Sequence, residues 1–329
     1  MKAVRFSAFG PPLDVVQLVD EAPGPLAPGE ALVEVLATPI NPSDMMTLLG
    51  IYGVLPKLPA VPGNEGVGRV VEVAGSDAVK PGQLVFLPMG SGTWRTHLKA
   101  RAAHLLSLPP GGDLKQLAML SINPPTADLL LREFVQLKPG DWVIQNAANS
   151  GVGRYLITLA KREGIRTVNV VRREELVAEL KALGADVVLV DGPELPKQVH
   201  EATGGAPVRL GIDAVGGSAT TRLGDAIAPR GVVVNYGAMS AKGPSLSAAA
   251  TIFKDVTLRG FWLVHWMNRA SREEQRALME RLAKLVTEGV LHAPVEGTFP
   301  LENIKEAMAR AMEGGRHGKV LLTPNGEVK

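Results

Sequence analysis

The sequence predicts an α/β protein in which a doubly wound parallel sheet is inserted into a β-rich domain. Short apolar runs separated by Gly and Pro fill the first hundred residues, whereas apolar runs alternate with amphipathic helical stretches after Leu114. Such alternation is typical of a parallel sheet with helices on both faces. A chain of 329 residues is also too long for one core. We therefore expect a β-rich domain at 1–122, a nucleotide-binding domain at 123–265 and a return to the first domain at 266–329.

Composition narrows the class of protein. The chain is 46% hydrophobic and 21% charged, as in ordinary globular proteins, and its net charge of +2 without a basic cluster argues against a nucleic-acid surface. No apolar run is long enough to span a bilayer. The first residues, MKAVRFSAFGPP, indicate a strand and a turn rather than a targeting segment, which predicts a cytoplasmic location. The absence of cysteine excludes disulfides, thiolate catalysis and cysteine-ligated zinc.

We predict strands and helices from the periodicity of apolar residues, and we place their ends at Gly and Pro residues. Pro28-Gly29 and Pro81-Gly82 mark tight turns in the β-rich part. Strands are expected at 31–37, 68–74, 83–87, 142–144, 167–171, 186–190, 210–215, 231–236, 257–263 and 319–322. Helices are expected at 114–121, 127–135, 154–163, 174–183, 220–228, 272–288 and 301–313.

Residues 138–175 form the unit around which the second domain is organised. They read as strand, small-residue turn, helix and strand, an arrangement that holds a dinucleotide pyrophosphate on backbone N–H groups at a helix N-terminus. The turn runs from Ala148 to Gly153, with residues other than glycine at two places where the usual fingerprint has glycine. Gly151 and Gly153 still permit close backbone approach. A small-residue turn with a purely structural role is the alternative.

The end of the second strand selects the nucleotide. An acidic residue there would bind the ribose 2′-OH of NAD, but Val171 is followed by Arg172 and Arg173. Arginine pairs with phosphate, so NADP(H) is the expected cofactor. The alternative is that both arginines, with Glu174 and Glu175, open a solvated helix.

Further motifs carry a family resemblance over nearly the whole chain. They include Ile40-Asn41-Pro42-Ser43-Asp44, Tyr52-Gly53, Gly63-Asn64-Glu65-Gly66, Gly92-Thr93-Trp94-Arg95-Thr96, Asn149 to Gly153 and Phe261-Trp262-Leu263. With these motifs the chain resembles the zinc-free branch of the medium-chain dehydrogenase/reductases, and within it the NADPH-dependent 2-enoyl thioester (trans-2-enoyl-CoA) reductases. The resemblance implies a Rossmann domain inserted in a GroES-like catalytic domain. It also implies a homodimer that joins through the last Rossmann strands, around residues 257–263.

The resemblance also implies roles for individual residues. Tyr52 is the catalytic acid, and Asn41, Trp94 and Trp266 are candidates for substrate contact. No zinc is expected, since zinc-dependent relatives have cysteine near Asn41 and histidine where Asn64 stands. The implied cofactor contacts are Asn123, Asn149, Ser150, Gly151, Val152, Arg172, Arg173, Glu174, Tyr236, Gly237, Ala238, Met239, Phe261, Trp262, Leu263 and Lys319.

The function implied is NADPH-dependent reduction of the C2=C3 double bond of trans-2-enoyl thioesters, a reaction of fatty acid metabolism. Hydride adds to the β-carbon, and Tyr52 acts as the acid. A quinone or enone oxidoreductase of the same superfamily and a non-catalytic NADPH-binding sensor are the alternatives. Ile51 stands where the family usually has asparagine, which leaves the acyl preference open. The carrier, coenzyme A or acyl carrier protein, and the pathway stay open as well.

Overall fold

The computed structural model describes residues 1–328, which form two compact units. The first unit contains residues 1–122 and 279–328, and the second contains residues 123–278. The chain re-enters the first unit at 279 rather than at 266. Helix α9 (Leu263–Arg269) belongs to the second unit, where Trp266 Nε1 donates a hydrogen bond to Glu133 Oε1 at 3.3 Å.

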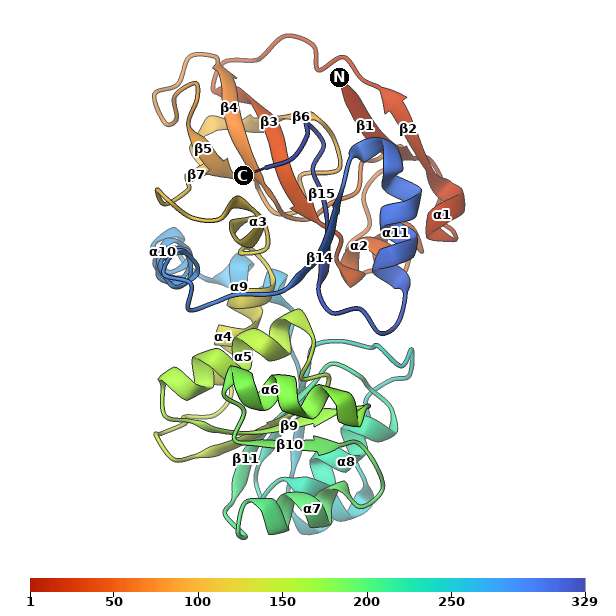
Figure 1. The fold of residues 1–329 in the computed structure, drawn as a ribbon, viewed down its shortest axis with the longest axis vertical. Helices are drawn as coiled ribbons and strands as arrows, with labels where there is room; N and C mark the ends of the chain where they lie inside the picture. The colour runs from red at the N-terminus through yellow and green to blue at the C-terminus, as the bar shows by residue number, and fades with distance from the viewer. Residues whose placement is uncertain (329) are drawn as a thin grey trace. The chain divides into compact units, whose positions relative to one another are not determined.

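The first unit is built on a mostly antiparallel sheet (Figure 1). Its strand order is β14-β15-β3-β4-β5-β7, and β6 also pairs with β3. The strands expected near 31, 68, 83 and 319 are confirmed. Strands of this unit are β1 (Lys2–Phe6), β2 (Val16–Asp20), β3 (Glu30–Pro39), β4 (Val67–Val73), β5 (Leu84–Phe86), β6 (His97–Arg101), β7 (Leu106–Ser107), β14 (Val295–Phe299) and β15 (Lys319–Leu322), and its helices are α1 (Pro12–Val15), α2 (Pro42–Leu48), α3 (Leu114–Leu117) and α11 (Ile304–Met312).

The second unit is a six-stranded parallel sheet in the order β10-β9-β8-β11-β12-β13, which confirms the predicted doubly wound fold. Helices α5 and α6 lie on one side of this sheet and α7 and α8 on the other (Figure 1). The strands are β8 (Trp142–Gln145), β9 (Arg166–Val171), β10 (Val187–Val190), β11 (Val208–Asp213), β12 (Val232–Asn235) and β13 (Thr257–Gly260), and the helices are α4 (Asn123–Arg132), α5 (Gly151–Arg162), α6 (Val177–Leu183), α7 (Leu195–Ala202), α8 (Ser218–Ala226) and α9, with α10 (Arg272–Thr287) crossing the boundary between units.

Two expected elements have other bounds in the structure, and two helices, α7 and α9, were not expected. Strand β13 ends at Gly260 instead of residue 263, because the backbone turns at Trp262 into helix α9, which the sequence pattern did not predict. Helix α5 begins at Gly151 instead of 154, since Ser150 caps it. Helix α7 was also missed, although Pro196 at its start is a common N-terminal signal.

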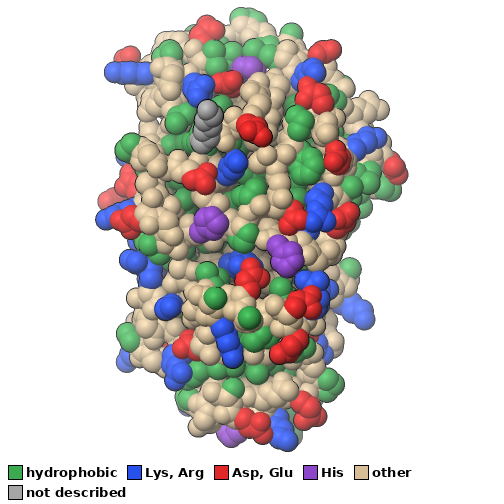
Figure 2. Space-filling view, viewed as in Figure 1, with side chains coloured by type: hydrophobic (Ala, Val, Ile, Leu, Met, Phe, Trp, Pro, Cys, Tyr) green, Lys and Arg blue, Asp and Glu red, His purple; other side chains and the backbone are tan. Residues whose placement is uncertain are grey.

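Charged side chains of both signs are interspersed on the face drawn in Figure 2. This arrangement accords with the net charge of +2. Within residues 1–328, every helix is too short or too polar to cross a membrane.

The carboxylate of Asp213 joins three strands of the second unit at their carboxyl ends. This fully buried side chain closes β11. Its oxygens accept hydrogen bonds from Asn146 Nδ2 at 2.6 Å after β8 and from Asn235 Nδ2 at 2.8 Å at the end of β12. Thr220 Oγ1 at 2.6 Å and the backbone N–H groups of Val215 and Gly216 also donate to it. One buried anion thus orders the loops of neighbouring strands.

Replacing the Asp213 carboxylate should weaken the hydrogen bonds that order the loops at the carboxyl edge of the parallel sheet. In Asp213→Asn an amide group would face donors that need an acceptor, so we expect the free energy of unfolding to fall by about 2 to 3 kcal/mol. Urea unfolding followed by tryptophan fluorescence measures the change. Asp255→Asn, which alters an exposed acid of the same unit, is the matched control. Equal unfolding free energies for both variants would contradict this role for Asp213.

Candidate active site

Four loops at one edge of the parallel sheet contain most of the predicted cofactor residues. Because all six strands run parallel, their carboxyl ends lie at the same edge. The loops after β8, β9, β12 and β13 contain residues 146–150, 172–174, 236–239 and 261–263. The strand order reverses between β8 and β11, and ligands of doubly wound sheets bind at such a switch point.

The turn after β8 is built to bring backbone groups close to a ligand. Ser150 Oγ accepts a hydrogen bond from the Gly153 N–H at 3.1 Å and caps helix α5. A Cβ on Gly153 would lie 2.5 Å from the carbonyl oxygen of Ala148, so only glycine fits. The N–H groups in the first turn of α5 have no partner within the helix, which suits a phosphate.

Arg172 and Arg173 differ in their surroundings. Arg172 is exposed just beyond the end of β9, and it makes no ion pair with any of residues 1–328. The Arg173 guanidinium pairs with Glu175 at 3.1 Å. Glu174 is exposed and begins a short 3₁₀ turn. Arg172 therefore offers an unpaired positive charge to an anion at this edge.

The loops after β12 and β13 contribute aromatic and apolar groups. Burial raises the pKa of Tyr236, whose hydroxyl lies near Ser150, and the phenol therefore stays protonated. Met239 is 62% exposed, and the Phe261 ring packs edge-on against Phe134 at 6.0 Å between centroids. The other predicted contacts in these two loops are Gly237, Ala238, Trp262 and Leu263.

Two predicted cofactor residues lie outside these loops. Asn123 is buried at the start of α4 in the second unit. Lys319 begins β15 in the first unit, where its ammonium donates a hydrogen bond to Asn41 Oδ1.

Tyr52 lies in the loop that follows helix α2 in the first unit. Its side chain is half-buried. Its neighbours Ile51 and Val54 are 65% and 62% exposed, and Leu55 is 40% exposed. The loop thus presents a phenol within an exposed apolar surface. A phenol can donate a proton, and the apolar side chains beside it can contact a hydrocarbon chain.

A buried polar cluster lies beneath α2, and we define it as Asn41, Asp44, Asn64, Glu65 and Lys319. Asn41 Nδ2 donates to Glu65 Oε1 at 2.8 Å, and Asn64 Nδ2 donates to Asp44 Oδ1 at 2.6 Å. The Asn41 N–H donates to Asp44 Oδ2 at 2.7 Å, which closes a capping box at the start of α2. The i, i+3 spacing of Asn41 and Asp44 is a local capping pattern, whereas nothing local in the sequence indicates that Glu65 joins them.

The cluster contains two carboxyl groups and one ammonium. Burial raises the pKa of Asp44 to about 7 against the attraction of Lys319 and the hydrogen bonds from Asn41 and Asn64. Burial likewise raises the pKa of Glu65 to about 7 against Lys319 and Asn41. Burial lowers the pKa of Lys319, against the attraction of Glu65 and Asp44.

The three residues expected to touch the substrate are buried within their units. Trp94 is completely buried in the apolar core of the first unit with Phe6 and Leu48, and its place in an acyl site stays a prediction. Trp266 is 8% exposed and bonded to Glu133. Asn41 is 3% exposed and belongs to the buried polar cluster.

Comparison with known families matches both units. The family described as alcohol dehydrogenase GroES-like domain matches residues 27–110, and the family described as zinc-binding dehydrogenase matches residues 151–284. Within residues 1–328, no group of three or more His, Cys, Asp or Glu side chains is placed to hold a metal ion.

Known proteins resemble the chain over almost its full length. The mitochondrial enoyl-[acyl-carrier-protein] reductases of rat and human are 39% and 38% identical, over 98% of this chain and 88% of theirs. The names of these relatives place them in mitochondria, and this finding overturns the cytoplasmic location expected from the N-terminal residues.

Solved structures share the fold. The complex of Etr1p with NADP and crotonyl-CoA has a TM-score of 0.89 at 28% identity, over 98% of this chain and 99% of that one. Escherichia coli quinone oxidoreductase complexed with NADPH has a TM-score of 0.88 at 26% identity, over 98% and 100%. The chain belongs to the medium-chain dehydrogenase/reductase superfamily, in the family of the enoyl-[acyl-carrier-protein] reductases.

Proposed function

We propose that the protein reduces the C2=C3 double bond of trans-2-enoyl thioesters with NADPH. The observation that carries this proposal is the match with the enoyl reductases, which runs through both units and includes the Tyr52 loop. The Etr1p complex with NADP and crotonyl-CoA, similar along the whole chain, supports the same substrate class.

The residues present suit each requirement of the reaction. NADPH, when bound, supplies a hydride for the β-carbon of the substrate. The helix α5 N-terminus and the turn capped by Ser150 offer N–H groups to its pyrophosphate. Tyr52 holds the proton that the reduced substrate needs, and a neutral phenol can also donate a hydrogen bond to the thioester oxygen as negative charge develops there. Ile51 and Val54 offer apolar surface to the acyl chain.

Removing the Tyr52 hydroxyl tests the acid. Tyr52→Phe keeps the ring and its packing, so we expect kcat for crotonyl-CoA to fall about 100-fold because proton donation is lost. NADPH affinity, measured by fluorescence titration, should stay unchanged. Turnover equal to that of the native enzyme would refute Tyr52 as the acid.

The same measurement separates the alternatives. A quinone oxidoreductase, favoured by the E. coli neighbour, would oxidise NADPH with a quinone faster than with any enoyl thioester and would not depend on Tyr52. A sensor would bind NADPH without oxidising it. A panel of short and long enoyl-CoAs beside a quinone therefore decides among the three functions.

We assign the cofactor preference to Arg172, since its charge is unpaired at the carboxyl edge of the sheet. Arg172→Ala should lower kcat/KM for NADPH about tenfold or more while leaving the value for NADH unchanged, because only NADPH has a 2′-phosphate. Arg162→Ala, at the opposite end of α5, is the matched control. An unchanged preference for NADPH would contradict this assignment.

We further propose that catalysis is independent of zinc. The buried polar cluster supports this, because its two carboxyl groups already face the ammonium of Lys319. Asn41 and Asn64 supply amides to these carboxyl groups. Such a set suits a proton and an ammonium better than a soft transition metal.

The cluster should make stability depend on pH. Its carboxyls have folded-state pKa values near 7, above their ordinary values of 3.8 and 4.5, so stability falls as pH rises toward and through 7. Lys319→Met removes the cation, and we expect it to cost about 3 kcal/mol of unfolding free energy at pH 8 and clearly less at pH 5.5, where both carboxyls bind protons. Urea unfolding at the two pH values measures this.

Lys305→Met, on the exposed side of α11, controls for the loss of one lysine. An equal loss of stability at both pH values would argue against a carboxyl cluster compensated by Lys319. Stoichiometric zinc in active protein, found by elemental analysis, would contradict the zinc-free assignment.

We also propose a homodimer that joins through β13. This strand is the last in the order of the parallel sheet, and most of it is exposed. Phe253 and Ile252, shortly before it, are 82% and 70% exposed. A second copy could extend the sheet across a two-fold axis and cover these side chains.

A further inference from the structure

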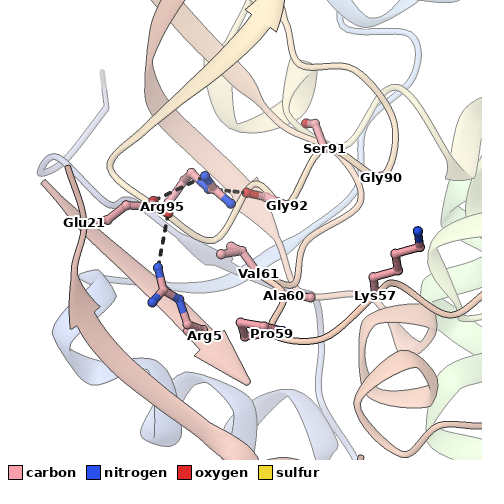
Figure 3. Close-up of a pocket in the computed structure, with 10 residues that line it drawn as sticks. All are labelled: Arg5, Glu21, Lys57, Pro59, Ala60, Val61, Gly90, Ser91, Gly92 and Arg95. Atoms are coloured by element: carbon pink, nitrogen blue, oxygen red, sulfur yellow. Dashed lines mark hydrogen bonds and ion pairs between the residues drawn. The ribbon is translucent and has the colours of Figure 1, made fainter. Parts of the chain in front are cut away.

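A cavity of about 400 Å³ opens in the first unit beside strand β1 (Figure 3). Backbone hydrogen bonds join the segments of chain that line this cavity. Phe6 and Ala60 exchange two such bonds at 2.9 and 3.0 Å, and the Gly92 N–H donates to the Gly63 carbonyl at 3.1 Å. A Cβ on Gly92 would lie 2.8 Å from the carbonyl oxygen of Val61, so the two loops are in close contact. The cavity is therefore preformed.

The charged side chains that line this cavity are unbalanced. Arg5, Lys57 and Arg95 face it together with one acid, Glu21. Arg95 Nη1 lies 3.2 Å from Glu21 Oε2, and Arg5 Nη2 lies 3.5 Å from Glu21 Oε1 (Figure 3). Lys57 is exposed and forms no ion pair with the part of the chain that the structure describes. The lining thus has an excess of two positive charges.

Two further observations indicate that this site suits an anion. The Arg95 guanidinium is held by its bond from Nε to the Gly92 carbonyl at 2.9 Å, and its side chain is only 20% exposed. Burial lowers the pKa of Arg95, against the attraction of Glu21, and the charge of Arg5 lowers it further. Ser91 Oγ is buried at the same cavity without a hydrogen-bond partner within residues 1–328.

The chemistry of the lining favours a phosphate. Guanidinium groups bind the oxygens of phosphate in pairs, and an ammonium and a hydroxyl complete such a site. A pyrophosphate diester such as that of coenzyme A carries about two negative charges at neutral pH, one on each phosphate, which matches the excess of charge, whereas a simple phosphodiester carries about one. One carboxylate would neutralise only half of it.

We propose that this cavity binds a phosphate group of the substrate's thioester carrier, an inference that rests on the function proposed above. Coenzyme A and the prosthetic group of an acyl carrier protein both attach a phosphate to their pantetheine arm. Lys57 follows Tyr52 by five positions, so the Cα atoms of the two residues are at most ~18 Å apart. A long, flexible carrier arm can cover such a distance.

The first test measures binding without turnover. Free coenzyme A and pantetheine, which has no phosphate, are titrated calorimetrically into protein saturated with NADP⁺, so that the nucleotide site is occupied. We expect Lys57→Gln to weaken coenzyme A binding about fivefold, the upper range for one exposed ion pair, and Arg5→Gln/Lys57→Gln to weaken it more. Pantetheine binding should not change. Lys80→Gln, which removes an exposed lysine elsewhere in this unit, is the control.

The second test uses the reaction. Lys57→Gln should raise KM for crotonyl-CoA about fivefold without changing kcat, and should leave the crotonyl thioester of N-acetylcysteamine, which has no phosphate, unaffected. Equal effects on both thioesters, or coenzyme A binding that matches the native protein, would overturn the proposal. If no thioester is reduced at all, the proposed function fails, and the calorimetric test still decides the phosphate site.

Competition identifies the source of the phosphate. Displacement of coenzyme A by 4′-phosphopantetheine would assign the cavity to the phosphate that both carriers share. Displacement by adenosine 3′,5′-bisphosphate alone would assign it to the nucleotide end of coenzyme A. Displacement by neither compound would refute a carrier phosphate site.

Discussion

The hydrogen bonds to the buried carboxylate of Asp213 are the constraint on which the nucleotide edge depends. Asn146 follows β8 and Asn235 ends β12, and both donate to this single group at the end of β11. The strand order reverses between β8 and β11. A parallel sheet leaves its strand ends to irregular loops, and here a satisfied buried anion fixes three of them. The capped turn that precedes α5 is therefore anchored on both sides.

The first unit also contains buried carboxyl groups that are held by hydrogen bonds. Its buried polar cluster closes the capping box of α2, the helix that leads into the Tyr52 loop. The hydrogen bonds of Asn41 and Asn64 hold the two carboxyls in place. The raised pKa values of both carboxyls, together with the charge of Lys319, lower the cost of their burial. Polar contacts thus fix the start of the helix that leads into the Tyr52 loop, while the side chains exposed on that loop are apolar.

Local patterns in the sequence predicted the parallel sheet, the glycine turn and the position of Arg172. These features depend on residues that are neighbours in the chain. Asp213 and the buried polar cluster could not be predicted in this way, because their partners come from strands that only the topology brings together. The burial of Trp94 in the core could not be predicted either, since nothing local distinguishes a core indole from one in a binding site. The roles of the predicted cofactor residues remain predictions.

The first unit is discontinuous, and this affects the order in which its contacts can form. Lys319 and Asn41 are bonded although 278 positions separate them. During synthesis the second unit, a continuous segment, has all its own strands before β15 exists. Glu65 and Asp44 have no cation in their cluster until the last residues leave the ribosome. Until β15 is synthesised, these carboxyls must therefore stay solvated or protonated. Formation of the complete cluster in the first unit is coupled to the synthesis of β15.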